Sequence, residues 1–303
     1  MISADGMFSV KFKQLNQKEK QDSLALYEDS FPEDRGAYAA YYYKWKCRDN
    51  EIFALIDSSR ESICAMLHLN PYRIWITTDS MILHYIVAVA TALPYRRKGC
   101  MRRLMLEAFF WLYSRGEPFT YLMPADTAYY EPFGFRVIYD QKPVSFPTDP
   151  ERANDWAREQ FDVVTMRDEA YMQFLEEEPG SNNVLSTESV EVVSDTGDGN
   201  SWKPQIMCRI IYLPRLLTCL RADCPRTIYL QVHDPLIEGN NGLYRWSVDR
   251  EHSCVTRIRS ETEVDYLDIS IEDLAEQLFG IAPLHPLLSH IRVLNRICIN
   301  EEV

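Results

Sequence analysis

Residues 86–130 read IVAVATALPYRRKGCMRRLMLEAFFWLYSRGEPFTYLMPADTAYY, and this stretch decides the fold. It starts with a β-prone apolar run at 86–91, passes through a basic turn at 96–99 and continues as an amphipathic segment. The apolar side chains of that segment share one helical face: Met101, Leu104, Met105, Ala108, Phe109 and Leu112. A strand that enters a cationic, glycine-containing turn at a helix N-terminus predicts a polyphosphate site, because free N–H groups and the helix dipole attract anions.

The composition describes an acidic globular protein. With 303 residues the chain is long enough for two domains, and its 46% hydrophobic residues suffice for a packed core. The formal net charge of −13 argues against a nucleic-acid partner, which normally requires a basic surface. The same charge has two interpretations, attraction of cationic substrates or simple solubility.

No metal site, secretion signal or membrane span is expected. The eight cysteines are scattered without a Cys-x-x-Cys pair, and the six histidines have no ligand partners nearby in sequence. The N-terminal residues lack the apolar core of a signal peptide, and the longest apolar run, at 81–93, is too short to cross a membrane. We therefore expect a cytoplasmic protein.

The first part of the chain predicts a mixed α/β (α+β) domain. Strands are expected at 8–12, 51–57, 62–70, 81–90, 119–123 and 133–139. Helices are expected before Pro32, at about 35–46 and after Gly99. This order implies a mixed sheet flanked by helices, in a domain that ends near residue 145.

The rest of the chain divides into a connector and a second α/β domain. Residues 146–204 predict helices at 151–161 and 165–178, a strand at 189–193 and several acidic turn clusters. From residue 205 an apolar run at 206–211 is followed by strands at 227–232, 243–248 and 253–258. Helices are expected after Pro214, from Ser270 to Gly280, and at 286–295.

The basic turn excludes two nucleotide-binding motifs and matches a third. It lacks the Gly-x-x-x-x-Gly-Lys-Ser/Thr pattern of a P-loop and the Gly-x-Gly-x-x-Gly dinucleotide fingerprint. Arg96 and Gly99 instead match the Gln/Arg-x-x-Gly-x-Gly/Ala motif with which GNAT acetyltransferases bind acyl-CoA; Met101 departs from its last small position. The chain resembles the enhanced intracellular survival type of this family. The features that carry this resemblance are the Val-Ala-Thr run before the turn, Tyr130 to Phe135, and the segment 299–303.

The resemblance implies a domain plan and a cofactor site. Residues 1–145 would be the GNAT domain, 146–204 a helical, acidic connector or reduced second module, and 205–303 a sterol-carrier-protein-like domain. Acetyl-CoA would be the co-substrate, with no metal. The residues expected to hold its pantetheine arm are Val89, Ala90 and Thr91, and those expected around its pyrophosphate are Arg97, Lys98, Gly99, Cys100, Met101 and Arg102.

The resemblance also implies the catalytic groups. Tyr130 would be the acid that protonates the departing thiolate, and the carboxylate of Val303 the base that takes the ammonium proton. Two alternatives stay open for these residues: Tyr129 in place of Tyr130, and an undocked chain end in place of a catalytic Val303. Cys100 is either a thiol of lowered pKa at the helix N-terminus or a bystander, and we favour the bystander.

The expected reaction is N-acetylation of a primary amine on a small cationic molecule or a lysine side chain. Glu33, Asp34 and the aromatic residues 41–45 are candidates to receive that amine, although aromatic residues at helical spacing are more often core. A non-catalytic acyl-CoA or lipid-binding module is the alternative function. Because the family forms assemblies, a homo-oligomer is one option for the quaternary structure.

Overall fold

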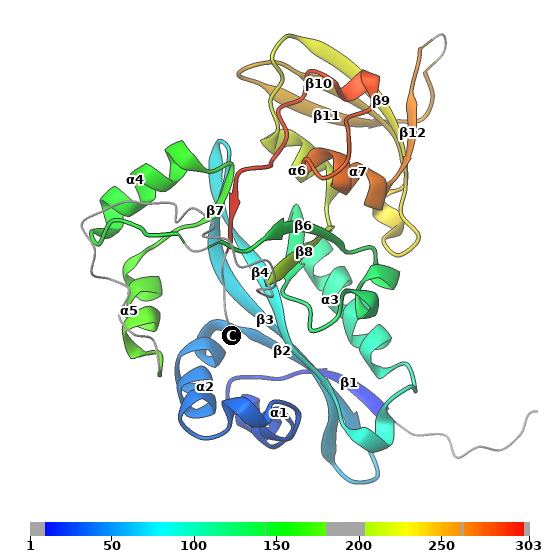
Figure 1. The fold of residues 1–303 in the computed structure, drawn as a ribbon. Helices are drawn as coiled ribbons and strands as arrows, with labels where there is room; N and C mark the ends of the chain where they lie inside the picture. Colours follow the sequence, from blue (N-terminus) through cyan, green and yellow to red (C-terminus); the bar gives the residue numbers. More distant parts are fainter. Residues whose placement is uncertain (1–9, 143, 180–203, 262–263, 300–303) are drawn as a thin grey trace, which may run out of the picture.

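A computed structural model of the chain describes residues 10–142, 144–179, 204–261 and 264–299. Within these ranges the strands form a nine-stranded mixed sheet and a four-stranded sheet (Figure 1). The large sheet contains β1 (Val10–Gln14), β2 (Glu51–Asp57), β3 (Ser62–Ile76), β4 (Asp79–Thr91), β5 (Phe119–Leu122), β6 (Arg136–Asp140), β7 (Val163–Thr165), β8 (Gln205–Ile210) and β13 (Ile297–Cys298). The small sheet contains β9 (Arg226–His233), β10 (Gly242–Val248), β11 (Ser253–Ile258) and β12 (Leu267–Ser270).

Helices flank both sheets. The α-helices of the described ranges are α1 (Leu24–Ser30), α2 (Ala37–Asp49), α3 (Cys100–Ser114), α4 (Pro150–Gln160), α5 (Glu169–Glu177), α6 (Leu213–Cys219) and α7 (Ile271–Leu278). Short 3-10 turns are η1 (Lys20–Ser23), η2 (Pro32–Asp34), η3 (Leu93–Tyr95), η4 (Thr127–Tyr129), η5 (Glu131–Phe133), η6 (Glu238–Asn240) and η7 (Pro286–Leu288).

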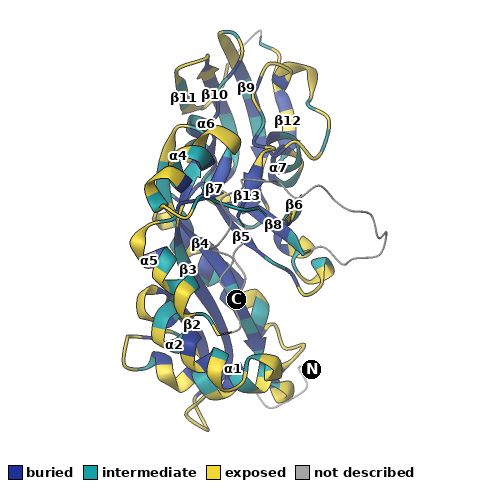
Figure 2. Ribbon diagram, turned by 60° about the vertical axis from the view of Figure 1, so that its left-hand side comes forward, coloured by how far each residue is buried: buried dark blue, intermediate teal, exposed yellow. Residues whose placement is uncertain are grey.

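The large sheet is covered on both faces. The long antiparallel hairpin of β3 and β4 forms its centre. The strand β2 pairs with β3, and β1 pairs with β2. The helix α3 buries Leu104, Ala108 and Leu112 in the main hydrophobic core and contacts β2, β3 and β4. The helices α1 and α2 pack over the other face, in a second cluster that includes Met66 and Ala90. Coloured by burial, the central strands are dark and the outer helix faces are exposed (Figure 2).

The small sheet joins the large one through α7. This helix contacts β12 of the small sheet and also β6 and β8 of the large sheet. Ser270 is the N-cap of this helix: its hydroxyl accepts a hydrogen bond from the Asp273 N–H at 3.0 Å and so fixes the helix start. The strand order is β11-β10-β9-β12, in which β12 runs parallel to β9 and the other pairs are antiparallel.

The structure confirms the mixed sheet flanked by helices and most of the predicted elements. The strands β2, β5, β9, β10 and β11 lie within one or two residues of their predicted bounds. The helical face of α3 is also confirmed, because the five apolar residues from Leu104 onward are buried and Met101 is half-buried. The predicted strand at 189–193 lies outside the described residues, as do residues 8 and 9 of the first strand.

Three predictions of local structure were wrong. The helix expected at 286–295 is only the single turn η7; beyond it Ile291 forms an isolated bridge with Ala222, so extended pairing replaces the helix. The strand expected to begin at 133 begins at Arg136, because residues 131–133 form η5 and Gly134 adopts a left-handed φ of 78°. The helix expected from 165 starts at Glu169, since Val163–Thr165 pair with β3 and β13.

The division of the chain at residues 145 and 204 stays a prediction. Strand pairing crosses both positions, because β7 pairs with β3 and β8 pairs with β5 and β6. The small sheet therefore begins only at β9, after β8 has completed the large sheet. Among the helices of the described residues, none has the length and apolar character needed to span a membrane.

Candidate active site

The strand β4 separates from β5 near its middle. Within the described residues these parallel strands share one registered pair, Tyr85 with Tyr121. The β3–β4 pairing shifts register between Met66 and His68, and opposite this shift Ala88 has a φ of 50°. A non-glycine residue in the left-handed region beside a register shift marks a β-bulge, which re-aims the strand. Residues 87–91 therefore lie beyond the last registered pair of β4 with β5, where the two strands separate.

The basic turn leads from this opening into α3. Arg97 and Gly99 both have positive φ values, of 60° and 79°, so the turn folds back on itself before the helix begins. Gly99 is the N-cap of α3, and within the described part of the chain no side-chain cap hydrogen bond is formed at this helix start. A Cβ atom placed on Gly99 would meet none of the described residues within 4 Å, so a ligand can approach this backbone closely. The turn and helix end together form an anion-binding geometry.

The predicted cofactor residues follow one another along the chain from β4 to the start of α3, and they differ in exposure. Ala90 and Cys100 are buried; Val89, Thr91 and Met101 are half-buried; Arg97, Lys98, Gly99 and Arg102 are exposed. The exposed cations lie beside the uncapped helix end, where they reinforce its attraction for an anion. Burial raises the pKa of the Cys100 thiol, which is the opposite of what an activated cysteine requires.

Two hydrogen bonds hold the turn in place, and sequence reasoning missed the first of them, between Tyr95 and Asp57. The Tyr95 hydroxyl donates a hydrogen bond to Asp57 at the end of β2, and Arg96 Nε donates to the Thr91 carbonyl at 3.0 Å. Hydrogen bonds from Ser59 and then Tyr95 hold the pKa of Asp57 at about 2. Asp57 and Tyr95 are far apart in sequence, so no local pattern could have indicated that they meet.

Tyr130 lies between η4 and η5, after β5. Its ring packs edge-on against Phe135, with centroids 6.0 Å apart. Burial raises the pKa of Tyr130 to about 12, so the phenol keeps its proton throughout the physiological range. The neighbouring Tyr129 is 61% exposed. Of the two alternatives, Tyr130 is half-buried and therefore the less exposed, which suits a proton donor better.

Val303 lies outside the described residues, and only the approach to it can be described. The strand β13 pairs in parallel with β7, and Ile299 just beyond it is fully buried. Arg296 anchors this strand: its Nη2 donates to Asp162 Oδ1 at 2.6 Å, and its backbone N–H donates to Asp162 Oδ2 at 3.0 Å. The last described residues are thus held against the large sheet.

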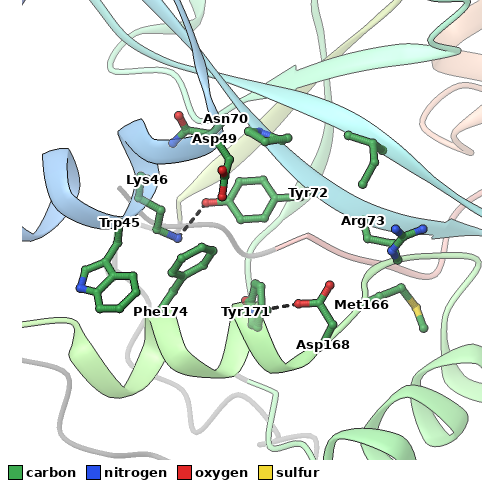
Figure 3. A pocket seen from close by; sticks show the side chains of 12 residues that line it. Trp45, Lys46, Asp49, Asn70, Tyr72, Arg73, Met166, Asp168, Tyr171 and Phe174 are labelled. Atoms are coloured by element: carbon green, nitrogen blue, oxygen red, sulfur yellow. Dashed lines mark hydrogen bonds between the residues drawn. The ribbon is translucent and has the colours of Figure 1, made fainter. Parts of the chain in front are cut away.

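The aromatic residues of α2 divide between the core and a pocket. Tyr41 and Tyr42 are buried in the second hydrophobic cluster, whereas Trp45 lines a pocket of about 160 Å³ between α2, β3 and α5 (Figure 3). Asp34 already accepts a hydrogen bond from the Tyr27 hydroxyl at 2.8 Å, and burial raises its pKa. A role for Glu33, Asp34 or the aromatic residues in amine binding stays a prediction.

Comparison with known proteins identifies the class of residues 11–138. Residues 11–138 match the family model described as acetyltransferase (GNAT) domain. This part of the chain, from β1 to β6, is therefore a GNAT acetyltransferase domain. It contains both β4, which separates from β5, and the start of α3. A comparison with curated protein sequences found no match.

Solved structures share the fold over almost the whole chain. A probable N-acyltransferase of unknown function from Enterococcus faecalis is 13% identical, with a TM-score of 0.71 over 96% of this chain and 97% of that one. A GCN5-related N-acetyltransferase from Anabaena variabilis is 15% identical, with a TM-score of 0.63 over 94% of each chain. Eis1 from Mycobacterium abscessus is 10% identical, with a TM-score of 0.58 over 88% of each chain. At these identities the likeness concerns the fold.

Proposed function

We propose that this protein is an acetyl-CoA-dependent N-acetyltransferase of the enhanced intracellular survival type, acting on a primary amine in the cytoplasm. One observation gives the main support for this proposal. The strand β4, which separates from β5 after Tyr85, leads into the turn at 97–99 with its left-handed residues, and this turn leads directly into the N-terminus of α3, which has no side-chain cap among the described residues. Such an arrangement suits a ligand with a long polar arm and a pyrophosphate. The small sheet and its helices are proposed to be the sterol-carrier-protein-like domain.

In this proposal the cofactor lies along the opening between β4 and β5. Backbone groups of Val89, Ala90 and Thr91 bind the pantetheine arm. N–H groups from Arg97 to Arg102 surround the pyrophosphate, and the exposed side chains of Arg97, Lys98 and Arg102 offset its charge. The thioester then lies toward the bulge at Ala88.

Acetyl transfer proceeds by direct attack. The lone pair of the neutral amine attacks the thioester carbonyl carbon, and the carbon–sulfur bond breaks. Tyr130 donates its proton to the departing thiolate, which its raised pKa permits at neutral pH. The Val303 carboxylate takes the ammonium proton, directly or through water. Cys100 has no part in this scheme, since no covalent intermediate is required.

Thiol release from acetyl-CoA in the presence of a panel of primary amines tests this function. We expect release to depend on both acetyl-CoA and amine. Replacing Tyr130 by Phe is expected to lower kcat about 100-fold with little change in acetyl-CoA affinity, because a positioned proton donor contributes on that order. Adding one residue after Val303 should lower kcat as well, because it moves the carboxylate.

Two results would contradict the proposal in different ways. Full turnover by both variants would show that the assigned acid and base are wrong. Acetyl-CoA binding without thiol release for every amine would instead support the alternative of a non-catalytic acyl-CoA or lipid-binding module.

A further inference from the structure

The turn before α3 has a conformation that its own residues do not favour. Arg97 has a φ of 60°, in the left-handed region where a side chain is strained, and Gly99 follows with a φ of 79°. Backbone of this kind persists only where the surrounding structure holds it. The geometry of the proposed pyrophosphate site therefore depends on contacts from outside the turn.

Tyr95, which precedes the turn, makes such contacts in three directions. Its hydroxyl donates to Asp57 Oδ2 at the end of β2, its carbonyl accepts from the Cys100 thiol at 3.6 Å, and the Lys98 ammonium lies over its ring, 5.7 Å from the centroid. Tyr95 is only 5% exposed, so packing holds it in this position. It thus connects the large sheet with the middle of the turn and with the first residue of α3.

Asp57 is a fixed partner for that hydroxyl. Its Oδ1 accepts from the Ser59 N–H at 2.8 Å and from Ser59 Oγ at 2.6 Å, while its Oδ2 accepts from Tyr95. These bonds hold the pKa of Asp57 at about 2, and the hydrogen bond to Asp57 raises the pKa of the Tyr95 phenol. At neutral pH the carboxylate is therefore charged and the phenol protonated, as a charge-assisted hydrogen bond requires.

Other hydrogen bonds support only the chain before the turn. The Ala92 N–H donates to the Cys64 carbonyl at 2.9 Å, and Arg96 Nε donates to the Thr91 carbonyl at 3.0 Å. Both bonds fix the backbone that leaves β4, and neither involves residues 97–99. The contacts of Tyr95 continue this support into the turn itself.

We propose that Tyr95 and Asp57 are positioning residues of the cofactor site, whose hydrogen bond holds residues 97–99 in the shape that binds acetyl-CoA before the cofactor arrives. The identity of the ligand rests on the proposed function. Without the bond, the strained turn adopts its binding shape only part of the time, and the apparent affinity falls with that population. The bound turn is the same in both cases, so turnover at saturating cofactor is kept.

The charge of Asp57 would by itself have the opposite effect on binding. Acetyl-CoA is a polyanion, so removing a nearby carboxylate should strengthen its binding if only charge mattered. Removing a positioning residue should weaken it, because Tyr95 then loses its anchor. The direction in which affinity changes in the variant D57A therefore separates the two roles.

Calorimetry with acetyl-CoA alone tests the proposal on the wild type, Y95F, D57A and the double variant. Y95F removes only the hydroxyl and keeps the ring beside Lys98. We expect each single variant to bind about tenfold more weakly, on the order of one charge-assisted hydrogen bond. The double variant should bind within about twofold of D57A, because the two residues act as one unit.

Two further measurements distinguish positioning from a general structural role. With an amine that the wild type acetylates, the KM for acetyl-CoA should rise about tenfold in Y95F, while kcat stays within about twofold. In hydrogen exchange, the N–H groups of residues 97–102 should exchange faster in free Y95F than in the free wild type. The two acetyl-CoA complexes should exchange alike.

The variant Y27F is the matched control, because Tyr27 is also buried and its hydroxyl donates to Asp34 Oδ2 at 2.8 Å, in the cluster under α1 and α2. It should leave acetyl-CoA affinity within about twofold of the wild type. Unchanged affinity in Y95F, tighter binding by D57A, or an equal loss in Y27F would overturn the inference. Binding of acetyl-CoA without acetyl transfer would reject the proposed reaction and leave this inference standing, whereas a wild type that binds no acetyl-CoA would overturn both.

Discussion

At the scale of single residues, Gly99 decides whether a ligand can approach the turn. It caps α3 with a φ of 79° and has open space where a Cβ would be. Replacing it by Ala is expected to cost about 1 kcal/mol in unfolding free energy, because a side chain is strained in the left-handed region. The new methyl group would also occupy the approach to the first-turn N–H groups, so we expect acetyl-CoA affinity to fall at least tenfold, as measured by calorimetry.

Gly116 supplies the control, since it follows the other end of the same helix. Its φ is 69°, and a Cβ there would meet, among the residues that the structure describes, only Tyr212, at 3.8 Å. The variant G116A should therefore lose a similar amount of stability in urea unfolding and keep its acetyl-CoA affinity. Equal affinity losses in both variants would attribute the effect of G99A to helix stability and argue against a phosphate site at this turn.

The sequence predicted the structure within one contiguous segment well, and contacts between residues far apart in the chain poorly. The basic turn and the face of α3 follow from the spacing of residues along one segment, so both could be derived from the amino-acid sequence itself. Asp57 with Tyr95, and Asn70 with Tyr42, meet only through pairing of β2, β3 and β4 and packing of α2. Their local sequence resembles that of ordinary strand or helix residues, and it contains no signal of the contact.

At the scale of secondary structure elements, the docking of β13 on β7 tests the role of the chain end. Asp162 binds the Arg296 side chain and backbone, which fixes the start of β13. The variant D162N removes the charge and one acceptor oxygen, so it should loosen β13 while leaving β4 and α3 unchanged. We expect kcat to fall several-fold, with an unchanged acetyl-CoA dissociation constant, in steady-state and binding measurements.

An arginine–aspartate pair elsewhere, whose aspartate is far more exposed than Asp162, gives the control. Arg292 Nε donates to Asp223 at 2.9 Å, and both side chains are more than half exposed. D223N should leave kcat within twofold of the wild type, since exposed pairs contribute about 1 kcal/mol or less. If hydrogen exchange shows β13 detached in D162N while kcat is unchanged, the Val303 carboxylate is not the base.

The same elements explain where prediction from sequence failed. The strands β7 and β13 have three and two residues, too few to show a period, and each forms only because a partner strand is present. The residues after Pro286 have a helical start signal, yet Arg292 donates its N–H to Arg221 and the chain stays extended. Tertiary pairing thus overrides local propensity in the last segment of the chain.

At the scale of the whole molecule, a buried ion pair joins the two sheets. Arg209 on β8 and Asp234 after β9 are both fully buried, with Nη2 2.7 Å from Oδ1. The guanidinium also lies 4.9 Å from the Phe109 ring, and a Cβ on Gly134 would come within 2.2 Å of Nη1. Phe109 packs near Phe135, and Phe135 near Tyr130, so the pair supports the loop of the proposed acid.

Removing one partner of this pair should therefore affect the entire fold. The variant R209M leaves the Asp234 carboxylate buried with its N–H donors from Leu236 and Ile237 but without a counter-ion. Loss of one member of a buried pair typically costs about 3–5 kcal/mol, and we expect a decrease of that order in urea unfolding. Because Nε and Nη1 of Arg209 have no partners among the described residues, the decrease should fall at the lower end of this range.

The variant R245M is the control for this prediction, because Arg245 is exposed on β10 and its loss should change stability by about 0.5 kcal/mol or less. A second result separates support of the Tyr130 loop from general stability. At a temperature where R209M remains folded, its kcat should be lower while acetyl-CoA binding is unchanged, since the ion pair lies next to the acid and not next to the turn at Gly99. Wild-type kcat in a folded but destabilised R209M would show that the pair joins the sheets without positioning Tyr130.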